Sequence, residues 1–431
     1  MIYLQEIQAV AGDPEALEAA YQDARRQRKE PAFQEALQAC YEQAPDNLLY
    51  AAWHVRLAQT RPERTVRWAL AVPLSIVLGL LTWLLALKRF DLPGQVPYLA
   101  LAWSAVATCF VIAFLAIASR EQIKRAALVA VGLLAALAYV SAFVVPRERP
   151  DYTLLMLLHL PLLAWIGCGL YLLGFRSGHR DRFAFVIKSI EVFVTAGLFA
   201  GAGGAFAAIT IGMFEALGIS LPEAVLRLLF GGGGGLIPVL AVAIGYDPAR
   251  SPIAQTFDQG LAKIVSTLMR LMLPLALVVL VIYIGVIPFN FMEPFQNRDT
   301  LIVYNVMLFA VMGLLVGATP VQETDLETKQ HRILRTGILA VAVLATLVSL
   351  YALSATAYRT ALGGFTVNRL TVIGWNAINI GILLLLIYKQ LRADAEGWLV
   401  ALQTTFAWGI RAYAVWATFL VLFIPLLFSE M

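Results

Sequence analysis

After Arg67 the sequence consists of apolar stretches of membrane-spanning length, separated by short polar segments. A helix crosses a hydrocarbon core of about 30 Å with about 20 apolar residues. In lipid every backbone polar group needs an internal partner, which favours helices as the spanning elements. The sequence therefore predicts an all-α, polytopic membrane helix bundle with eleven spans near 68–87, 96–118, 124–145, 152–174, 183–217, 221–245, 261–289, 300–318, 333–357, 366–388 and 398–428.

The composition supports a membrane protein and argues against several kinds of site. Hydrophobic residues make up 60% of the chain and charged residues 14%, whereas a soluble protein is about half apolar and a quarter charged. Cys40, Cys109 and Cys168 are scattered and form no metal-binding spacing with histidine. We expect membrane lipids as partners, and no metal, no cofactor and no nucleic acid.

Residues 1–66 are polar and differ from the rest of the chain. Asp13-Pro14, Pro31 and Pro45-Asp46 mark three helix starts, which predicts a small soluble helical domain over 1–66 ahead of a transmembrane domain over 67–431. Residues 44–53 distantly resemble a tetratricopeptide-type helix start. The match covers about one helix pair, and a stable array needs at least three repeats. This favours a cap domain over a peptide receptor, and a protein partner at this domain stays open.

The basic residues predict the topology. With the N-terminus inside, the inner loops carry thirteen Lys and Arg residues and the outer loops seven. Loops on the cytoplasmic side carry the excess of positive charge. With an odd number of spans, this count predicts a cytoplasmic N-terminus and a C-terminus outside.

Five consecutive glycines interrupt the sixth span. Each glycine costs a helix about 1 kcal/mol relative to alanine, and Pro238 follows them. Broken spans of this kind are the best sequence pointer to a transporter's binding site. We therefore expect α-helical hydrogen bonding to fail there, and we take as the candidate substrate site Gly231, Gly232, Gly233, Gly234 and Gly235. The alternative is that these glycines let a neighbouring helix pack closely.

The fifth span is rich in small residues, which lie on several faces of the predicted helix. Gly197, Gly201, Gly204 and Gly212 are among them. Small residues let helices approach closely in lipid. We expect two or more neighbours to pack against this span, with the glycine-rich sixth span among them, at the centre of the bundle.

Charged residues inside spans are costly and are functional candidates by default. Glu191 lies three residues after Lys188, and we expect it to pair with Lys188 or with Arg270 rather than face lipid. Glu191 and Arg270 join the candidate substrate site. Glu223 and Arg227, four residues apart, predict a second ion pair.

The sequence contains none of the common catalytic motifs. The glycine run lacks the Gly-Lys-Ser/Thr ending of a phosphate-binding loop, and HExxH and GxSxG are absent. An enzymatic activity is therefore unsupported.

Two motifs resemble an uncharacterised family of bacterial membrane proteins, domain of unknown function family 4153. The first runs from Arg270 through Pro274 to Tyr283, and the second covers 358–370, a turn before a late span. The resemblance extends over roughly 260–428. In the second motif, 361–363 replace the family's usual tyrosine-glycine approach, which puts the role of that turn in doubt. The resemblance implies a multi-pass bacterial inner-membrane protein and supplies no activity.

Three function classes stay open. The broken sixth span and the charges within spans favour a transporter or permeation path for a small solute. The helical N-terminal domain and the lack of site motifs favour a non-catalytic scaffold or accessory subunit of an envelope complex. Only the basic inner loops favour a membrane enzyme that acts on lipid.

Overall fold

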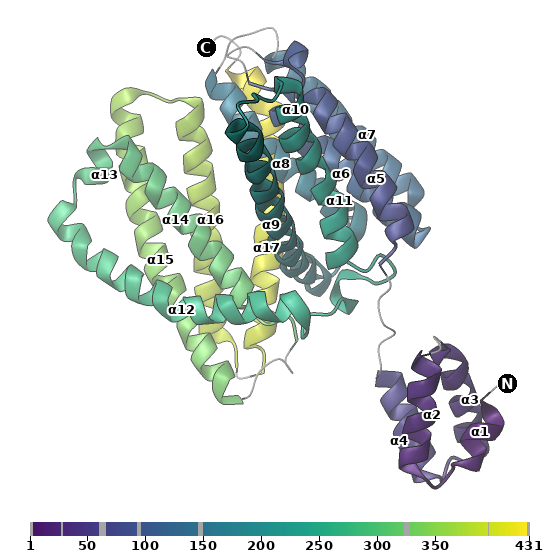
Figure 1. Cartoon of the computed structure of the whole chain (residues 1–431). Coiled ribbons are helices and arrows are strands. Elements are labelled where there is room, and N and C mark those ends of the chain that lie inside the picture. The colour runs from purple at the N-terminus through teal and green to yellow at the C-terminus, as the bar shows by residue number, and fades with distance from the viewer. Residues whose placement is uncertain are drawn as a thin grey trace. The chain divides into compact units, whose positions relative to one another are not determined.

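The structure is a computed structural model that describes residues 3–26, 29–59, 66–92, 96–144, 150–322, 328–394 and 396–428. Its contacts divide the chain into two units, Met1–Thr65 and Val66–Met431, which we describe separately (Figure 1).

The first unit consists of four short helices, α1 (Leu4–Ala9), α2 (Pro14–Arg26), α3 (Glu30–Gln43) and α4 (Leu48–Gln59). Phe33 is fully buried, and its ring contacts those of Tyr3, Tyr21 and Trp53. This aromatic cluster gives the unit a hydrophobic core of its own.

The second unit contains, in its described part, eleven helices that are long and apolar enough to cross a membrane. They confirm the predicted all-α polytopic bundle, and the chain is a multi-pass membrane protein. The spanning elements are α5 (Trp68–Leu85), α6 (Tyr98–Ser119), α7 (Ile123–Val144), α8 (Pro150–Leu173), α9 (His179–Ala216), α10 (Glu223–Arg227) with the π-helical turn η2 (Leu228–Gly232) and α11 (Gly233–Gly245), α12 (Gly260–Val286) continued by η4 (Ile287–Asn290), α14 (Arg298–Ala318), α15 (Thr328–Gly363), α16 (Val367–Arg392) and α17 (Trp398–Leu427). Short connecting helices are η1 (Lys88–Phe90), η3 (Pro252–Ala254) and α13 (Glu293–Gln296).

The spanning helices form two groups, each with its own hydrophobic core (Figure 1). We call α5–α8, α10, η2 and α11 the N-lobe, and α12, α14, α15 and α16 the C-lobe. In Figure 1, α12 is strongly inclined to α14 and α15, which it contacts.

Helix α17 joins the two lobes. Its first half supplies Leu402 and Phe406 to the core of the C-lobe, and its second half supplies Leu420 and Val421 to the core of the N-lobe. Tyr413, between these halves, packs against both cores. Helix α9 also contacts elements of both lobes.

Helix α9 has several neighbours, with α11 of the sixth span among them, but the expectation that its glycine-rich part is packed on several faces is wrong. From Gly197 to Gly212 the helix is largely exposed, and a Cβ added at Gly197, Gly201, Gly204 or Gly212 would meet no atom within 4 Å. Helix α9 contacts α11 through its first half, where a Cβ on Gly245 would lie 2.7 Å from Cγ2 of Val192. Small residues permit close approach, but they do not determine where a neighbour lies.

Candidate functional site

The glycine run lies at a change in helical hydrogen bonding. Leu228–Gly232 form a π-helical turn, and Gly233–Gly245 continue as α-helix. The α-helical pattern is thus interrupted, as the glycines predicted, but the backbone stays helical rather than unwound. π-helical turns within α-helices are frequent at functional sites.

The glycines bring this segment against α5. A Cβ on Gly235 would lie 2.0 Å from Oγ1 of Thr82 and 2.9 Å from Cα of Gly79. A Cβ on Gly231 would lie 3.0 Å from Cβ of Ala86, whereas one on Gly234 would meet nothing within 4 Å. The face that carries Gly231 and Gly235 therefore serves close helix packing, and the partner is α5 rather than α9.

A hollow of about 620 Å³ lies beside the glycines, between α5, α6 and α11. Its walls include Trp103, Phe230 and Pro238, with Arg227 as the charged residue. The hollow is lined almost entirely by residues of the N-lobe, mostly apolar ones. It offers a ligand few polar contacts.

Arg227 fixes the N-terminal end of this segment. It pairs with Glu223 at 2.7 Å and with Asp91 at 2.9 Å, and it also donates to the carbonyl of Ala86. Its hydrogen bonds to Asp91 hold the pKa of that carboxyl below its ordinary value. These contacts tie α10 to the connection between α5 and α6, which is a structural arrangement.

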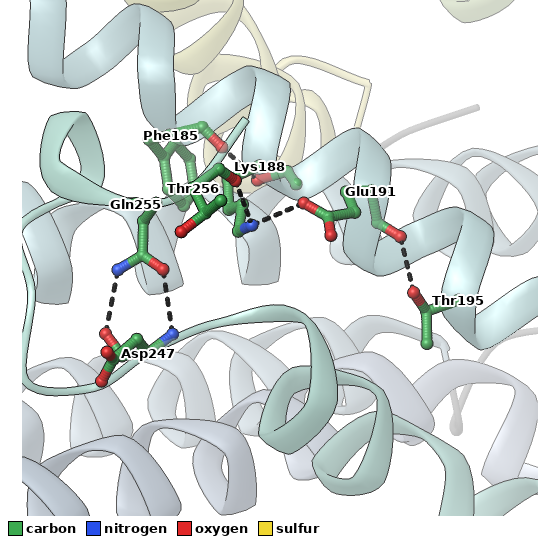
Figure 2. Close-up of polar contacts among 8 residues, drawn as sticks. Phe185, Lys188, Glu191, Thr195, Asp247, Gln255 and Thr256 are labelled. Atoms are coloured by element: carbon green, nitrogen blue, oxygen red, sulfur yellow. Dashed lines mark hydrogen bonds and ion pairs between the residues drawn. The ribbon is translucent and has the colours of Figure 1, made fainter. Parts of the chain in front are cut away.

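Lys188 and Glu191 form an ion pair on the first half of α9. Nζ of Lys188 lies 2.6 Å from Oε2 of Glu191, and it also donates to the carbonyl of Thr256 at 3.0 Å (Figure 2). The ring of Phe257 lies 5.5 Å from the same nitrogen. Both side chains are largely buried, at 6% and 13% exposure.

The loop that follows α11 completes the surroundings of this pair. Gln255 donates to the carbonyl of Asp247 and accepts from the Asp247 amide, so that the loop is closed on itself (Figure 2). Because Lys188 donates to Thr256 in the same loop, the ion pair anchors the loop to α9.

Arg270 lies in a different place, on α12. Its Nε donates to the carbonyl of Ala318 at 3.3 Å, and it lines a cleft of about 1360 Å³ between α12, the end of α14 and the start of α15. Lys263, Arg332 and Asp258 also line this cleft, together with Ser266, Thr267, Thr336 and other polar side chains. The starts of α12 and α15 belong to the end of the bundle that the topology predicts to be cytoplasmic, so we call this space the inner cleft.

A second cleft, of about 1060 Å³, opens at the opposite end of the bundle, and we call it the outer cleft. One wall is α8 of the N-lobe, and the other is formed by α14 and α16 of the C-lobe. Three arginines, Arg298, Arg359 and Arg369, line it. The walls below them are mostly apolar.

A buried polar cluster closes the outer cleft. Trp375 donates its indole N–H to Nε2 of His159 at 3.1 Å, while Nδ1 of His159 bonds the carbonyl of Leu155 at 2.7 Å. Because tryptophan is only a donor, Nε2 must accept, and the imidazole is neutral with both nitrogens used. It is therefore not arranged as a metal ligand. Tyr413 donates to Oδ1 of Asn379 beside it.

Two donors of this cluster are unsatisfied in the described part of the chain. Nδ2 of Asn376 and Nδ2 of Asn379 are buried without a partner, and both side chains are 1% exposed. A buried donor left without an acceptor costs about 1–3 kcal/mol. Both asparagines lie on α16, and neither lines the outer cleft.

The described residues bring together no group of three or more histidine, cysteine or acidic side chains able to hold a metal ion. Cys40, Cys109 and Cys168 are free thiols. No catalytic nucleophile with a paired base emerges within the described ranges either.

The outer cleft was not anticipated from the sequence. Its residues come from 151–166, 298–309, 356–375 and 413–417. From the sequence, the three arginines count as topology signals, and Arg359 and Arg369 also belong to the family-like turn at 358–370, but nothing there predicts a shared site. One signal was available in the sequence. Three consecutive spans each carry an arginine at the end that is predicted to lie outside, where basic residues are otherwise few.

No family model, no curated protein and no solved structure matches this chain, so the family resemblance over 260–428 stays a prediction.

Proposed function

We propose that this chain is a transporter of the bacterial cytoplasmic membrane, in which a solute passes between the N-lobe and the C-lobe. The proposal rests on one observation: the outer cleft has one wall from each lobe. The inner cleft opens at the other end of the bundle and lies between helices of the C-lobe. Alternating access commonly arises when one helix bundle rocks against another around a central site.

The connecting elements fit this motion. Helix α17 places its two halves in different cores, and Tyr413 packs against both. Gly235 brings α11 into close contact with α5 within the N-lobe, so we expect these two helices to move together. In this proposal the glycine segment stiffens a lobe, Arg270 faces solute in the inner cleft, and Lys188 and Glu191 hold the loop beside it.

A spin-label measurement tests whether the lobes move. In a chain whose three cysteines are replaced by alanine, Ala142→Cys on α7 and Ala357→Cys on α15 place one label on each lobe at exposed positions. We expect two distance populations in lipid nanodiscs. The control pair, Ala142→Cys with Leu84→Cys, lies within the N-lobe and should give one population. A single, narrow inter-lobe distance under all conditions would contradict the proposal.

The orientation is tested separately. We expect an impermeant maleimide to label Glu430→Cys in intact cells and to label Gln22→Cys only after lysis, because the basic count and the odd number of spans predict ends on opposite sides of the membrane. The reverse pattern would overturn the topology and exchange the names of the two clefts.

A scaffold is the second candidate, and the exposed glycine-rich face of α9 favours it. A Cβ added at Gly197, Gly201, Gly204 or Gly212 would meet no atom within 4 Å. In a membrane such a face suits contact with another helix. Under this alternative the lobes would not move relative to each other, so the spin-label measurement distinguishes the two candidates.

A further inference from the structure

The chemistry of the outer cleft identifies the class of molecule that it fits. We propose that it binds an anionic amphiphile, with a phosphate-bearing head group at Arg298, Arg359 and Arg369 and an apolar chain between α8 and α14. This inference deepens the proposed transport function by naming its substrate class, and it rests on the proposal that the cleft is the substrate site.

The charge at the mouth is the first argument. Arg359 donates to the carbonyl of Gln296, and Arg369 donates to the carbonyl of Gly364, so backbone oxygens position both side chains. No ion pair to a carboxylate is formed by any of the three arginines within the described ranges. Asp151 is the acidic residue that lines the cleft, which leaves an excess of positive charge.

Arginine suits a phosphate. Its planar guanidinium offers several N–H donors in a fixed arrangement, which matches phosphate oxygens. Arg359 and Arg369 each use part of their donor set on the backbone and retain further N–H groups for a ligand. Basic residues are also fewer on this predicted side of the membrane, so their convergence at one cleft is not explained by topology alone.

The apolar walls are the second, independent argument. Leu154, Leu158 and Leu162 recur at spacings of four along α8, and all three are more than a third exposed. Ile302, Val306 and Phe309 form a similar exposed stripe on α14. Two apolar stripes that line one space suit a hydrocarbon chain rather than a hydrated ion.

The length of the cleft along α14 agrees with the thickness of one leaflet of a bilayer. Arg298 and Phe309 lie eleven residues apart on α14, which corresponds to about 16 Å at a rise of about 1.5 Å per residue. Half of a hydrocarbon core is about 15 Å. A head group at the arginines would therefore place its chain along the stripes and end it near Trp375 and His159, which close the cleft.

The test is lipid binding to the purified full-length chain in a neutral detergent, measured by native mass spectrometry. The probes are phosphatidic acid, phosphatidylcholine with the same acyl chains, and inorganic phosphate. We expect one phosphatidic acid molecule to bind at concentrations at which phosphatidylcholine and inorganic phosphate do not. Equal binding of the two lipids would overturn the anionic part of the proposal.

Variants locate the site. The triple variant Arg298→Gln/Arg359→Gln/Arg369→Gln should weaken phosphatidic acid binding at least about tenfold. Because two of these arginines bond the backbone, the single variant Arg298→Gln, whose side chain is exposed, tests the same point with less risk to folding. The control Lys88→Gln/Arg89→Gln removes charge from the same end of the bundle, outside the cleft, and should leave binding unchanged. Unchanged binding in both arginine variants would overturn the assignment.

A separate variant tests whether the apolar walls of the cleft bind the hydrocarbon chain. Val306 is 64% exposed in the cleft, so Val306→Trp should fill the space between the stripes without disturbing a core. We expect it to abolish phosphatidic acid binding. Phosphatidic acid binding that is retained in this variant would show that the cleft is a simple anion site. An equal affinity of the unaltered chain for inorganic phosphate would show the same, and either result would overturn the proposal of an amphiphile.

These results are independent of transport. Selective phosphatidic acid binding with lobes that do not move would reject the transporter and keep the amphiphile site. Moving lobes without lipid selectivity would reject only the amphiphile.

Discussion

Replacing Gly235 by alanine should lower the thermal stability of the purified protein more than an alanine substitution at any other glycine of the run. The new Cβ would lie 2.0 Å from Oγ1 of Thr82 and 2.9 Å from Cα of Gly79. The Thr82 side chain is able to rotate, but the Gly79 contact is with backbone, so α5 and α11 must separate. Overpacking of this kind costs about 1–3 kcal/mol. A thermal unfolding series in one detergent measures the effect.

Gly234→Ala is the matched control. A Cβ at Gly234 meets no atom within 4 Å, and alanine favours the helix by about 1 kcal/mol over glycine. We expect unchanged or raised stability. If both variants lose stability equally, the close contact with α5 is not the reason for the glycines. If neither does, the helices are not packed as described.

Breaking the buried ion pair of α9 should give the second large effect. Lys188→Met would leave the carboxylate of Glu191 without its cationic partner, and Glu191→Leu would leave a buried ammonium. Removing one partner of a buried pair costs about 3–5 kcal/mol, because the remaining charge is uncompensated. Each single variant should therefore unfold at a clearly lower temperature than the unaltered chain.

The double variant Lys188→Met/Glu191→Leu should recover a large part of that loss. Replacing both partners by apolar residues of similar size removes the uncompensated charge, and such replacements are often neutral or stabilising. The carbonyl of Thr256 would still lose its donor, so recovery is expected to be incomplete. Additive losses in the double variant would contradict a mutual structural pair and would support separate roles for the two residues.

The spans were predictable because their signal is local. A run of about 20 apolar residues has few alternatives to a spanning helix, and all eleven predicted segments correspond to helices of the structure. Ion pairs at spacings of three and four on one helix are also local, and the structure contains Lys188 with Glu191 and Arg227 with Glu223.

The contact between the fifth and sixth spans was predicted, but α5 as the partner of the glycine run was not, because small residues permit close packing without choosing a neighbour. Helix α9 contains more small residues than α5, and small residues are typical of close helix packing. The glycine run nevertheless packs against Gly79 and Thr82 of α5. That choice depends on how two surfaces fit along their whole length. The outer cleft was missed for a related reason: Arg298, Arg359 and Arg369 are far apart in sequence, and only the packing of α14, α15 and α16 brings them to one space.

Coupling between the two clefts is the most direct test of the proposed transport mechanism. In a chain without its native cysteines, Thr267→Cys reports access to the inner cleft, and its labelling by an impermeant maleimide is followed in inside-out vesicles. Val306→Trp in the outer cleft serves as a wedge that holds the two lobes apart at that end. The inner cleft lies within the C-lobe, so the proposed motion must also shift α12 against α14 and α15. If the two clefts are coupled in this way, the wedge should slow labelling of Thr267→Cys severalfold. An unchanged labelling rate in the wedged protein, with the fold intact, would contradict the account.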